Sequence, residues 1–361
     1  MVKWLKVDNF RSLVNFKINF TTMNILLGKN GSGKSTVFEV IENLKFFIKG
    51  DCTVDDVFEF DSLTRWQLVP VQTFALCIES NSMDYIYTLE IEFNNELKKC
   101  RVKKESVTYD GNFIFKAENG KAFLFNDSYK QGPEVLVNWQ ISGVSAVFDR
   151  NDNKKLSNFK KLVEKIIVAH PDPNCILDVF YPQNNDSCIT YNVDNISEVY
   201  FSSIQATPEK LPRLWNLLKE INPCFLRTYI KGDIGKSLCF EYEYNGVKTS
   251  YKITEISDGE RILFVLYFIV VMYLENGYSL LIDEPDNYIS LEEILPLVQE
   301  IQDALENKGQ CILISHHPNI IDYFAPSNGI FFERRSYGAT EIVNSLDSDS
   351  GLTYSEILLH K

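Results

Sequence analysis

Apolar residues in the first part of the chain either alternate with polar ones or form short unbroken runs. Residues 3–7 and 14–20 alternate, which predicts two strands, and residues 23–27 form an apolar run typical of a buried strand. Between residues 36 and 47 the apolar positions recur every three or four residues, which predicts a helix. We therefore expect a small antiparallel sheet beside a buried strand that leads into a helix.

Short runs typical of β-strands follow an irregular polar segment at 48–70. They cover residues 72–79, 85–93, 98–109 and 112–117. The dipeptides Asp110-Gly111 and Asn119-Gly120 are typical of tight hairpin turns. The pattern predicts an antiparallel meander of about four to six strands.

The middle of the chain combines helical and β patterns. Residues 154–168 predict an amphipathic helix, and we interpret its basic outer face as solvated charge, with a nucleic-acid or partner patch as the alternative. Residues 175–207 give no clear prediction. A helix is predicted at 208–221, and strands at 225–230, 237–244 and 248–253.

Three strongly apolar runs lie in the last third of the chain. Residues 262–274 are too few to cross a bilayer, so we expect a buried helix there. The runs at 278–282 and 311–314 predict two buried strands, and each ends in polar residues.

Composition narrows the class of protein. The chain has 361 residues, of which 45% are hydrophobic and 24% charged, as in globular proteins with a sizeable core. The formal net charge of −13 argues against a large non-specific nucleic-acid surface, although it leaves room for a local basic groove. The eight cysteines form no CxxC pair, and the N-terminus has no apolar signal segment, so we expect a cytoplasmic protein with reduced thiols.

Residues 28–36 join the predicted buried strand to the helix and read GKNGSGKST. They fit G-x-x-x-x-G-K-[ST], the phosphate-binding P-loop, in which backbone N–H groups at a helix start face the phosphates. Lys34 would reach the β- and γ-phosphates, and the Ser35 hydroxyl would hold Mg²⁺. The predicted nucleotide-binding residues are Asn30, Gly31, Ser32, Gly33, Lys34, Ser35 and Thr36. A chance glycine-rich turn is the alternative.

The two later apolar runs end in residues suited to nucleotide hydrolysis. Asp283-Glu284 after the first run fits a Walker B motif, in which Asp283 holds Mg²⁺ and Glu284 orients or deprotonates the attacking water. His316 follows the second run, and at the ligand edge of an open α/β sheet it could bond the γ-phosphate. A strand ending in an acidic turn and a structural histidine are the respective alternatives.

Several motifs occur in an order known from one group of ATPases. Ser257-Asp258-Gly259-Glu260 resembles the signature motif of ABC-type ATPases, although alone it is a common helix cap. With Asn-Phe-Arg-Ser at 9–12, the P-loop, residues 283–287 and Ser-His-His-Pro at 315–318, the chain resembles the RecF/SMC-like branch of ABC ATPases. Within that branch it looks most like ATPases related to the OLD (overcoming lysogenization defect) family, known from bacterial anti-phage defence, toxin–antitoxin and retron-linked systems.

The resemblance implies an α/β fold, the ABC-type P-loop NTPase head. That fold has a mixed central sheet, a flanking antiparallel β-meander and a helical insertion, and we expect no long coiled coil. The implied division places an ATPase lobe with the P-loop at 1–95, an inserted β/helical subdomain at 96–225, and a second ATPase lobe at 226–361.

The resemblance also implies that two copies share each ATP, in a sandwich homodimer or a larger assembly. Ser257 and Gly259 of one copy would close over the γ-phosphate held by Lys34 of the other. Glu284 would be the catalytic carboxylate and His316 the switch histidine. Asp286 or Asn287 would make the D-loop contact, and Arg11 would lie near the nucleotide.

The chain departs from the family pattern at several positions. Asp258 stands where transporters have glycine, and residues 288–290 read Tyr-Ile-Ser in place of Leu-His-Pro. The Q-loop glutamine is not assigned, and Gln72 and Gln140 are candidates. About forty-five residues follow the histidine motif, which is too few for the TOPRIM nuclease domain of OLD nucleases.

These features favour an ATP-binding and hydrolysing ABC-type ATPase that senses or regulates through a separate effector, a nuclease or toxin, in anti-phage defence. One alternative is a RecF-like DNA-repair ATPase that binds DNA. Another is an OLD-like nuclease subunit, for which Asp347-Ser348-Asp349 is the compact acidic candidate. A transporter ATPase is less consistent with the N-terminal motif, and we expect no membrane partner.

Overall fold

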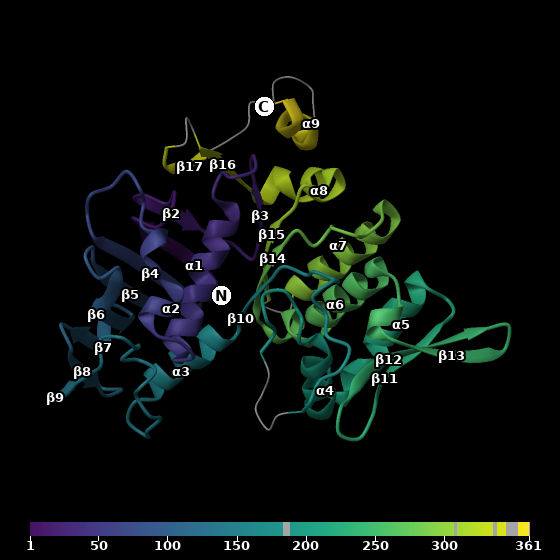
Figure 1. Ribbon diagram of the computed structural model, residues 1–361, viewed down its shortest axis with the longest axis horizontal. Coiled ribbons are helices and arrows are strands. Elements are labelled where there is room, and N and C mark those ends of the chain that lie inside the picture. Colours follow the sequence, from purple (N-terminus) through teal and green to yellow (C-terminus); the bar gives the residue numbers. More distant parts are fainter. Residues whose placement is uncertain (183–187, 307–308, 335–337, 344–352, 361) are drawn as a thin grey trace. The chain divides into compact units, whose positions relative to one another are not determined.

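The chain folds into two compact units in a computed structural model that describes residues 1–182, 188–306, 309–334, 338–343 and 353–360 (Figure 1). The first unit comprises Met1–Thr21, Leu26–Ile166 and Ile330–Ser348, and the second comprises Thr22–Ile25, Ile167–Gly329 and Asp349–Lys361. The division of the chain at residues 95 and 225, made from the sequence, stays a prediction.

An eight-stranded antiparallel sheet dominates the first unit, in the order β2-β1-β4-β5-β6-β7-β8-β9. Its strands are β1 Val2–Asp8, β2 Phe16–Asn19, β4 Val71–Ser80, β5 Met83–Asn94, β6 Lys99–Tyr109, β7 Asn112–Glu118, β8 Lys121–Phe125 and β9 Gln131–Leu136. Alternate residues of β5, from Tyr85 to Phe93, are buried, so one face of the sheet belongs to the core. The predicted meander is confirmed, and it continues through β8 and β9.

Helices pack on the buried face of this sheet. They are α1 Lys34–Lys49, α2 Val54–Val57, η1 Phe60–Ser62 and α3 Lys154–Glu164. Phe159 of α3 stacks on Tyr87 of β5 with ring centroids 6.0 Å apart, and Phe58 after α2 lies 4.8 Å from Phe74 of β4. The expectation of an irregular segment at 48–70 was wrong in part, because α2 and η1 form there.

The helix predicted over 154–168 was too long. It ends at Glu164, and Ile166–Ala169 forms strand β10 instead. All four residues of β10 are buried, which a helix with one solvated face cannot provide, and three of them are β-branched residues suited to a strand. Short apolar runs of this kind fit a helix or a strand equally well when only their periodicity is considered.

A second sheet of six strands is mixed, in the order β10-β14-β15-β3-β16-β17. Its other strands are β3 Met23–Leu27, β14 Ser279–Asp283, β15 Gln310–Ile314, β16 Gly329–Arg334 and β17 Thr340–Val343. β14 and β15 run parallel and every residue in them is buried, whereas β16 and β17 form an antiparallel pair. The predicted strands before the P-loop, Walker B motif and histidine motif are all found.

The second unit surrounds its strands with helices and a small antiparallel sheet. Its helices are α4 Ile196–Ala206, η2 Pro208–Lys210, α5 Leu211–Ile221, η3 Ile253–Glu255, α6 Asp258–Met272, η4 Leu274–Asn276, α7 Leu291–Leu305, α8 Pro318–Asn328 and α9 Tyr354–His360. The small sheet contains β11 Phe225–Lys231, β12 Ser237–Tyr244 and β13 Val247–Lys252 in that order. Residues 262–272 of α6 are all buried, so the prediction of a buried helix is confirmed.

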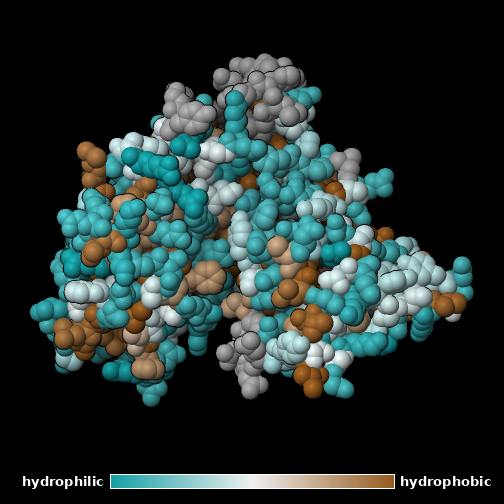
Figure 2. All heavy atoms as spheres, viewed as in Figure 1, coloured by the Kyte–Doolittle hydropathy of each residue, from teal (hydrophilic) through white to brown (hydrophobic). Residues whose placement is uncertain are grey.

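The described helices are too short for a coiled-coil arm or a membrane span. Among the described residues the longest helix, α1, has 16 residues, so the described part of the chain contains no long coiled coil. No helix in these ranges has the length and apolar character needed to span a bilayer. On the face shown in Figure 2 hydrophilic residues predominate, and apolar side chains occur in small scattered groups.

Candidate nucleotide site

The P-loop has a backbone that only glycine allows at two positions. Gly28 and Gly33 have φ angles of +148° and +102°. A Cβ on Gly28 would lie 2.4 Å from the carbonyl oxygen of Phe332, and one on Gly33 would lie 2.5 Å from Thr340 Oγ1. The loop therefore connects β3 to α1 in a fixed shape that a side chain at either glycine would disrupt.

The start of α1 has the features of an anion site. Gly33 is the N-cap residue, so the cap position has no side chain that could accept a hydrogen bond from the N–H groups at the start of the helix. Ser32 Oγ is buried and has no hydrogen-bond partner among the residues that the structure describes. Lys34 Nζ donates to the carbonyl oxygens of Gly28 at 2.7 Å and Lys29 at 3.1 Å, so it lies over the loop. Phosphate oxygens would supply acceptors for these donors, so the residues fit a nucleotide.

Residues far away in the sequence support the loop. Thr340 Oγ1 on β17 donates to the Ser32 carbonyl at 2.9 Å and lies 2.8 Å from Ser12 Oγ. The Thr340 N–H donates to the Ser12 carbonyl at 2.8 Å. Arg334 reaches the Gly31 carbonyl at 3.5 Å and lies over the Trp66 ring. No local pattern in the sequence points to Thr340 or Arg334, because their partners are about three hundred positions away.

Arg11 lies in the turn before Ser12. Its backbone has a φ of 49°, and its N–H donates to the Ser62 carbonyl at 2.6 Å. The guanidinium pairs with Glu39 of α1 at 2.5 Å. Burial raises the pKa of the Glu39 carboxyl, and the charge of Arg11 opposes that rise. Arg11 therefore contacts the helix that begins at the P-loop, while its role near a nucleotide stays a prediction.

The two candidates for the Q-loop glutamine have different environments. Gln72 is fully buried on β4, and its Nε2 donates to the Asn9 carbonyl and to Ser62 Oγ, both at 3.0 Å. Gln140 lies in an exposed loop. The Gln72 side chain thus stabilises the turn that contains Asn9 through hydrogen bonds.

In the second unit, Glu284 and His316 lie close together. Asp283 ends β14 and is 4% exposed, and Glu284 follows with a φ of 52°. The Glu284 N–H donates to the Ile314 carbonyl at 2.8 Å, which ties this turn to the end of β15. His316 Nε2 lies 4.0 Å from Glu284 Oε1, and Asn287 Nδ2 donates to Glu284 Oε2 at 2.9 Å. The side chains of His316 and Glu284 are both partly exposed to solvent.

The signature residues begin α6. Ser257 is the exposed N-cap residue, and its Oγ accepts a hydrogen bond from the Glu260 N–H at 3.3 Å. A Cβ on Gly259 would lie 2.9 Å from the Tyr288 carbonyl oxygen, so the signature lies against the loop that follows Asp283. Asp258, the residue that departs from the transporter pattern, pairs with Arg261 Nη2 at 3.1 Å. The structure therefore brings Gly259 beside the Walker B loop.

Two residues that contact Asp283 were missed by the sequence analysis. Tyr191 OH donates to Asp283 Oδ2 at 3.4 Å, and His170 Nδ1 lies 3.1 Å from the Asp283 carbonyl oxygen. His170 follows the apolar run of β10, as Asp283 ends the apolar run of β14. The apolar run at 166–169 was therefore a signal for His170 in the sequence, but its periodicity also fits the end of a helix. The acidic candidate at 347–349 lies outside the described residues.

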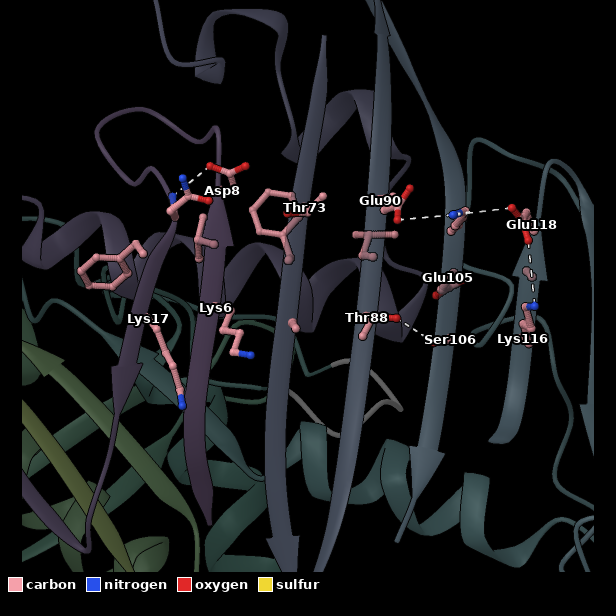
Figure 3. A pocket seen from close by; sticks show the side chains of 18 of the residues that line it. Lys6, Asp8, Lys17, Thr73, Thr88, Glu90, Glu105, Ser106, Lys116 and Glu118 are labelled. Atoms are coloured by element: carbon pink, nitrogen blue, oxygen red, sulfur yellow. Dashed lines mark hydrogen bonds and ion pairs between the residues drawn. The ribbon is translucent and has the colours of Figure 1, made fainter. Parts of the chain in front are cut away.

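The first unit also has a groove of about 580 Å³ on the open face of its eight-stranded sheet (Figure 3). No P-loop residue lines it. Lys104 lies 3.6 Å from both Glu90 and Glu118, and Lys116 lies 4.0 Å from Glu118, so several of its charges neutralise one another. We regard the groove as a solvated sheet face, separate from the nucleotide site.

Comparisons with known proteins agree with this geometry. A family model described as "AAA domain" matches residues 5–222, more than half of the chain. A second, described as "AAA domain, putative AbiEii toxin, Type IV TA system", matches residues 145–322. A comparison with curated protein sequences gives no match.

Solved SMC head domains share the fold. A crystal structure of an SMC head bound to the C-winged helix domain of ScpA is 14% identical, with a TM-score of 0.56 over 95% of this chain and 97% of that one. The SMC head domain from Thermotoga maritima is also 14% identical, with a TM-score of 0.51 over 95% and 99%. A head with an extended coiled coil, bound to the C-terminal domain of ScpA derived from Pyrococcus furiosus, is 13% identical, with a TM-score of 0.52 over 95% of both.

The predicted fold class, an ABC-type P-loop ATPase head with a mixed sheet and a flanking antiparallel sheet, is confirmed by these structures. The P-loop between β3 and α1 lies within the residues that the first family model matches. The chain therefore belongs to this AAA domain family and is an ATPase of the AAA type with the fold of an SMC head.

Proposed function

We propose that the chain binds ATP with Mg²⁺, hydrolyses it, and uses the bound nucleotide to control its association with a second copy. The observation that carries this proposal is the P-loop, where the start of α1 after the N-cap Gly33, the buried Ser32 hydroxyl and Lys34 converge. Lys34 would exchange its carbonyl partners for the β- and γ-phosphates, with backbone N–H groups from Asn30 to Thr36 around them.

The residues proposed for the metal are Ser35 and Asp283. The Ser35 hydroxyl is exposed at the first turn of α1, and Asp283 is a buried carboxylate at a strand end, both oxygen donors of the kind that Mg²⁺ prefers. Bound Mg²⁺ would neutralise part of the charge that develops on the phosphates. Asp283 would act from the end of β14, which holds it in place.

Glu284 and His316 are proposed to act on the attacking water and the γ-phosphate. Glu284 would accept a proton from water or orient it, and the hydrogen bond from Asn287 holds one of its oxygens. His316, 4.0 Å from the other oxygen, would bond the γ-phosphate and respond to its loss. Because both side chains are partly exposed, a γ-phosphate and a water molecule could reach them from solvent.

The signature residues are proposed to act on the ATP of another copy. The exposed Ser257 hydroxyl and the N–H groups at the start of α6 would bind the γ-phosphate held by Lys34 of the second copy. Arg11 would lie near the nucleotide of its own copy. In this arrangement ATP joins two copies, in a homodimer or a larger assembly, and its hydrolysis separates them.

We propose that this cycle controls a separate effector protein, a nuclease or toxin, in bacterial anti-phage defence. The match of residues 145–322 to a family whose description includes a type IV toxin–antitoxin system supports that setting. So does the resemblance of the motifs to OLD-related ATPases. The effector would recognise the ATP-joined form and lose its partner when the nucleotide is hydrolysed.

Replacement of Lys34 tests the assignment of the site. We expect Lys34→Ala to bind ATP at least roughly thirtyfold more weakly, since removing one partner of a buried charge pair costs about 2 kcal/mol or more. The matched control is Lys49→Ala at the opposite end of α1, which should bind normally. Equilibrium dialysis with labelled ATP and phosphate release measure both variants, and unchanged binding by Lys34→Ala would refute the assignment.

A further inference from the structure

We propose that His170 and Tyr191 form a positioning pair for Asp283, which holds this carboxylate ready for the metal. The inference rests on the proposed function, because Asp283 is assigned to Mg²⁺ there. It adds two residues from outside the recognised motifs. The pair lies entirely within the second unit, where β10 is the neighbour of β14.

His170 is fixed at the end of β10. Its N–H donates to the Tyr191 carbonyl at 2.6 Å, and its ring Nδ1 lies 3.1 Å from the Asp283 carbonyl oxygen. A carbonyl oxygen only accepts hydrogen bonds, so Nδ1 carries the proton in this contact. His170 therefore joins the strand end of β10 to the main chain at the end of β14.

Tyr191 is held over this histidine. Its ring stacks on the His170 ring with centroids 5.8 Å apart and planes 18° from parallel. From that position its hydroxyl donates to Asp283 Oδ2 at 3.4 Å. One residue thus fixes the main chain of Asp283, and the other fixes the direction of its carboxylate.

The chemistry of Asp283 explains what such a pair would do. Metal coordination needs a carboxylate oxygen held at a fixed position, and the hydrogen bond from the Tyr191 hydroxyl restricts the orientation of the Asp283 carboxylate. Residues that hold a metal ligand in this way typically change metal affinity by about 10–100-fold when they are removed. The expected role is in the affinity for Mg²⁺, with little effect on the binding of the nucleotide alone.

A purely structural role of Tyr191 and His170 predicts a different outcome. A half-buried tyrosine usually finds a partner for its hydroxyl, and stacking on His170 would serve to anchor the segment between β10 and α4. Removal of the Tyr191 hydroxyl would then alter stability slightly and leave the Mg²⁺ requirement unchanged. The concentration of Mg²⁺ needed for tight nucleotide binding separates the two roles.

The test measures binding of a fluorescent ATP analogue to the full chain, in EDTA and across a series of MgCl₂ concentrations. For Tyr191→Phe and His170→Ala we expect the Mg²⁺ concentration at half-maximal effect to rise roughly tenfold. Affinity in EDTA should stay within about twofold, because neither residue is assigned to the nucleotide. His170→Asn should restore the wild-type value, since its side-chain amide can replace Nδ1 as a donor to the Asp283 carbonyl.

Tyr181→Phe is the matched control, because Tyr181 is 65% exposed in the same unit, and it should behave as wild type. A Tyr191→Phe protein with an unchanged Mg²⁺ midpoint would overturn the inference while the proposed function stands. Failure of the wild-type chain to bind the analogue in any condition would instead overturn the proposed function. Equal loss of binding with and without Mg²⁺ in Tyr191→Phe would show a structural role and also overturn the inference.

Discussion

Replacement of Thr340 by valine removes the hydroxyl that joins three segments around the P-loop and leaves the shape of the side chain almost unchanged. Thr340 Oγ1 donates to the Ser32 carbonyl at 2.9 Å and lies 2.8 Å from Ser12 Oγ. The side chains of Thr340, Ser12 and Ser32 are all buried, at 3%, 5% and 3% exposure. Water cannot easily replace the missing partner, so the polar groups left behind lose their hydrogen bonds.

The size of the effect follows from these contacts. Leaving a buried polar group without a partner costs about 1–3 kcal/mol, so we expect Thr340→Val to lower the free energy of unfolding by that amount. In the variant the P-loop would also be less ordered before nucleotide binds, so binding would have to order it. If this ordering costs about 1.4 kcal/mol of the binding free energy, the affinity for ATP falls tenfold.

Urea unfolding and titration with a fluorescent ATP analogue measure the two effects. Thr340→Ser keeps the hydroxyl and serves as the control, with both values expected close to wild type. A Thr340→Val protein with wild-type stability and wild-type affinity would refute the reasoning, because the hydroxyl would then contribute nothing to the loop. A loss of stability with full affinity would restrict the role of Thr340 to folding.

Two further predictions concern the signature and the first helix. Gly259→Ala places a Cβ 2.9 Å from the Tyr288 carbonyl oxygen, so the start of α6 must shift. We expect the rate of phosphate release to fall several-fold, because the signature residues would be displaced. The affinity for ATP at low protein concentration should stay unchanged. Burial raises the pKa of the Glu42 carboxyl on α1 to about 7. Because the unfolded chain ionises this group near pH 4.5, Glu42 lowers stability as pH rises from there to about 7. Glu42→Gln should therefore raise the melting temperature at pH 8 and leave it unchanged at pH 4, and equal melting curves at pH 8 would contradict this.

The local features of the site could be predicted from the sequence. β3 has the predicted bounds of 23–27, and α1 begins at Lys34, as the P-loop pattern requires. The two strands that end at Asp283 and Ile314 were also predicted, because buried strands ending in polar residues are visible as unbroken apolar runs. Each of these features depends on residues close together in the chain.

The residues that support the P-loop and Asp283 from distant parts of the chain could not be predicted in the same way. Thr340 acts on Ser32 across more than three hundred positions, and no local pattern records that contact. His170 follows a run of four apolar residues that continues a helical pattern. The sequence therefore predicted a helix where the structure has strand β10. Helices α7 and α8 were also missed, and the interiors of both contain a proline, a residue that normally argues against a helix.

The central claim is that ATP joins two copies of the chain, and the molar mass of the Glu284→Gln protein tests it most directly. Without the carboxylate that we propose to be catalytic, this variant should bind ATP and hydrolyse it at least about a hundredfold more slowly, so the joined form should accumulate. Light scattering is expected to give 41.7 kDa for one chain without nucleotide and at least twice that mass with ATP and Mg²⁺. Lys34→Ala should stay at the mass of one chain in both conditions. A Glu284→Gln protein that stays at 41.7 kDa in saturating ATP would contradict the account.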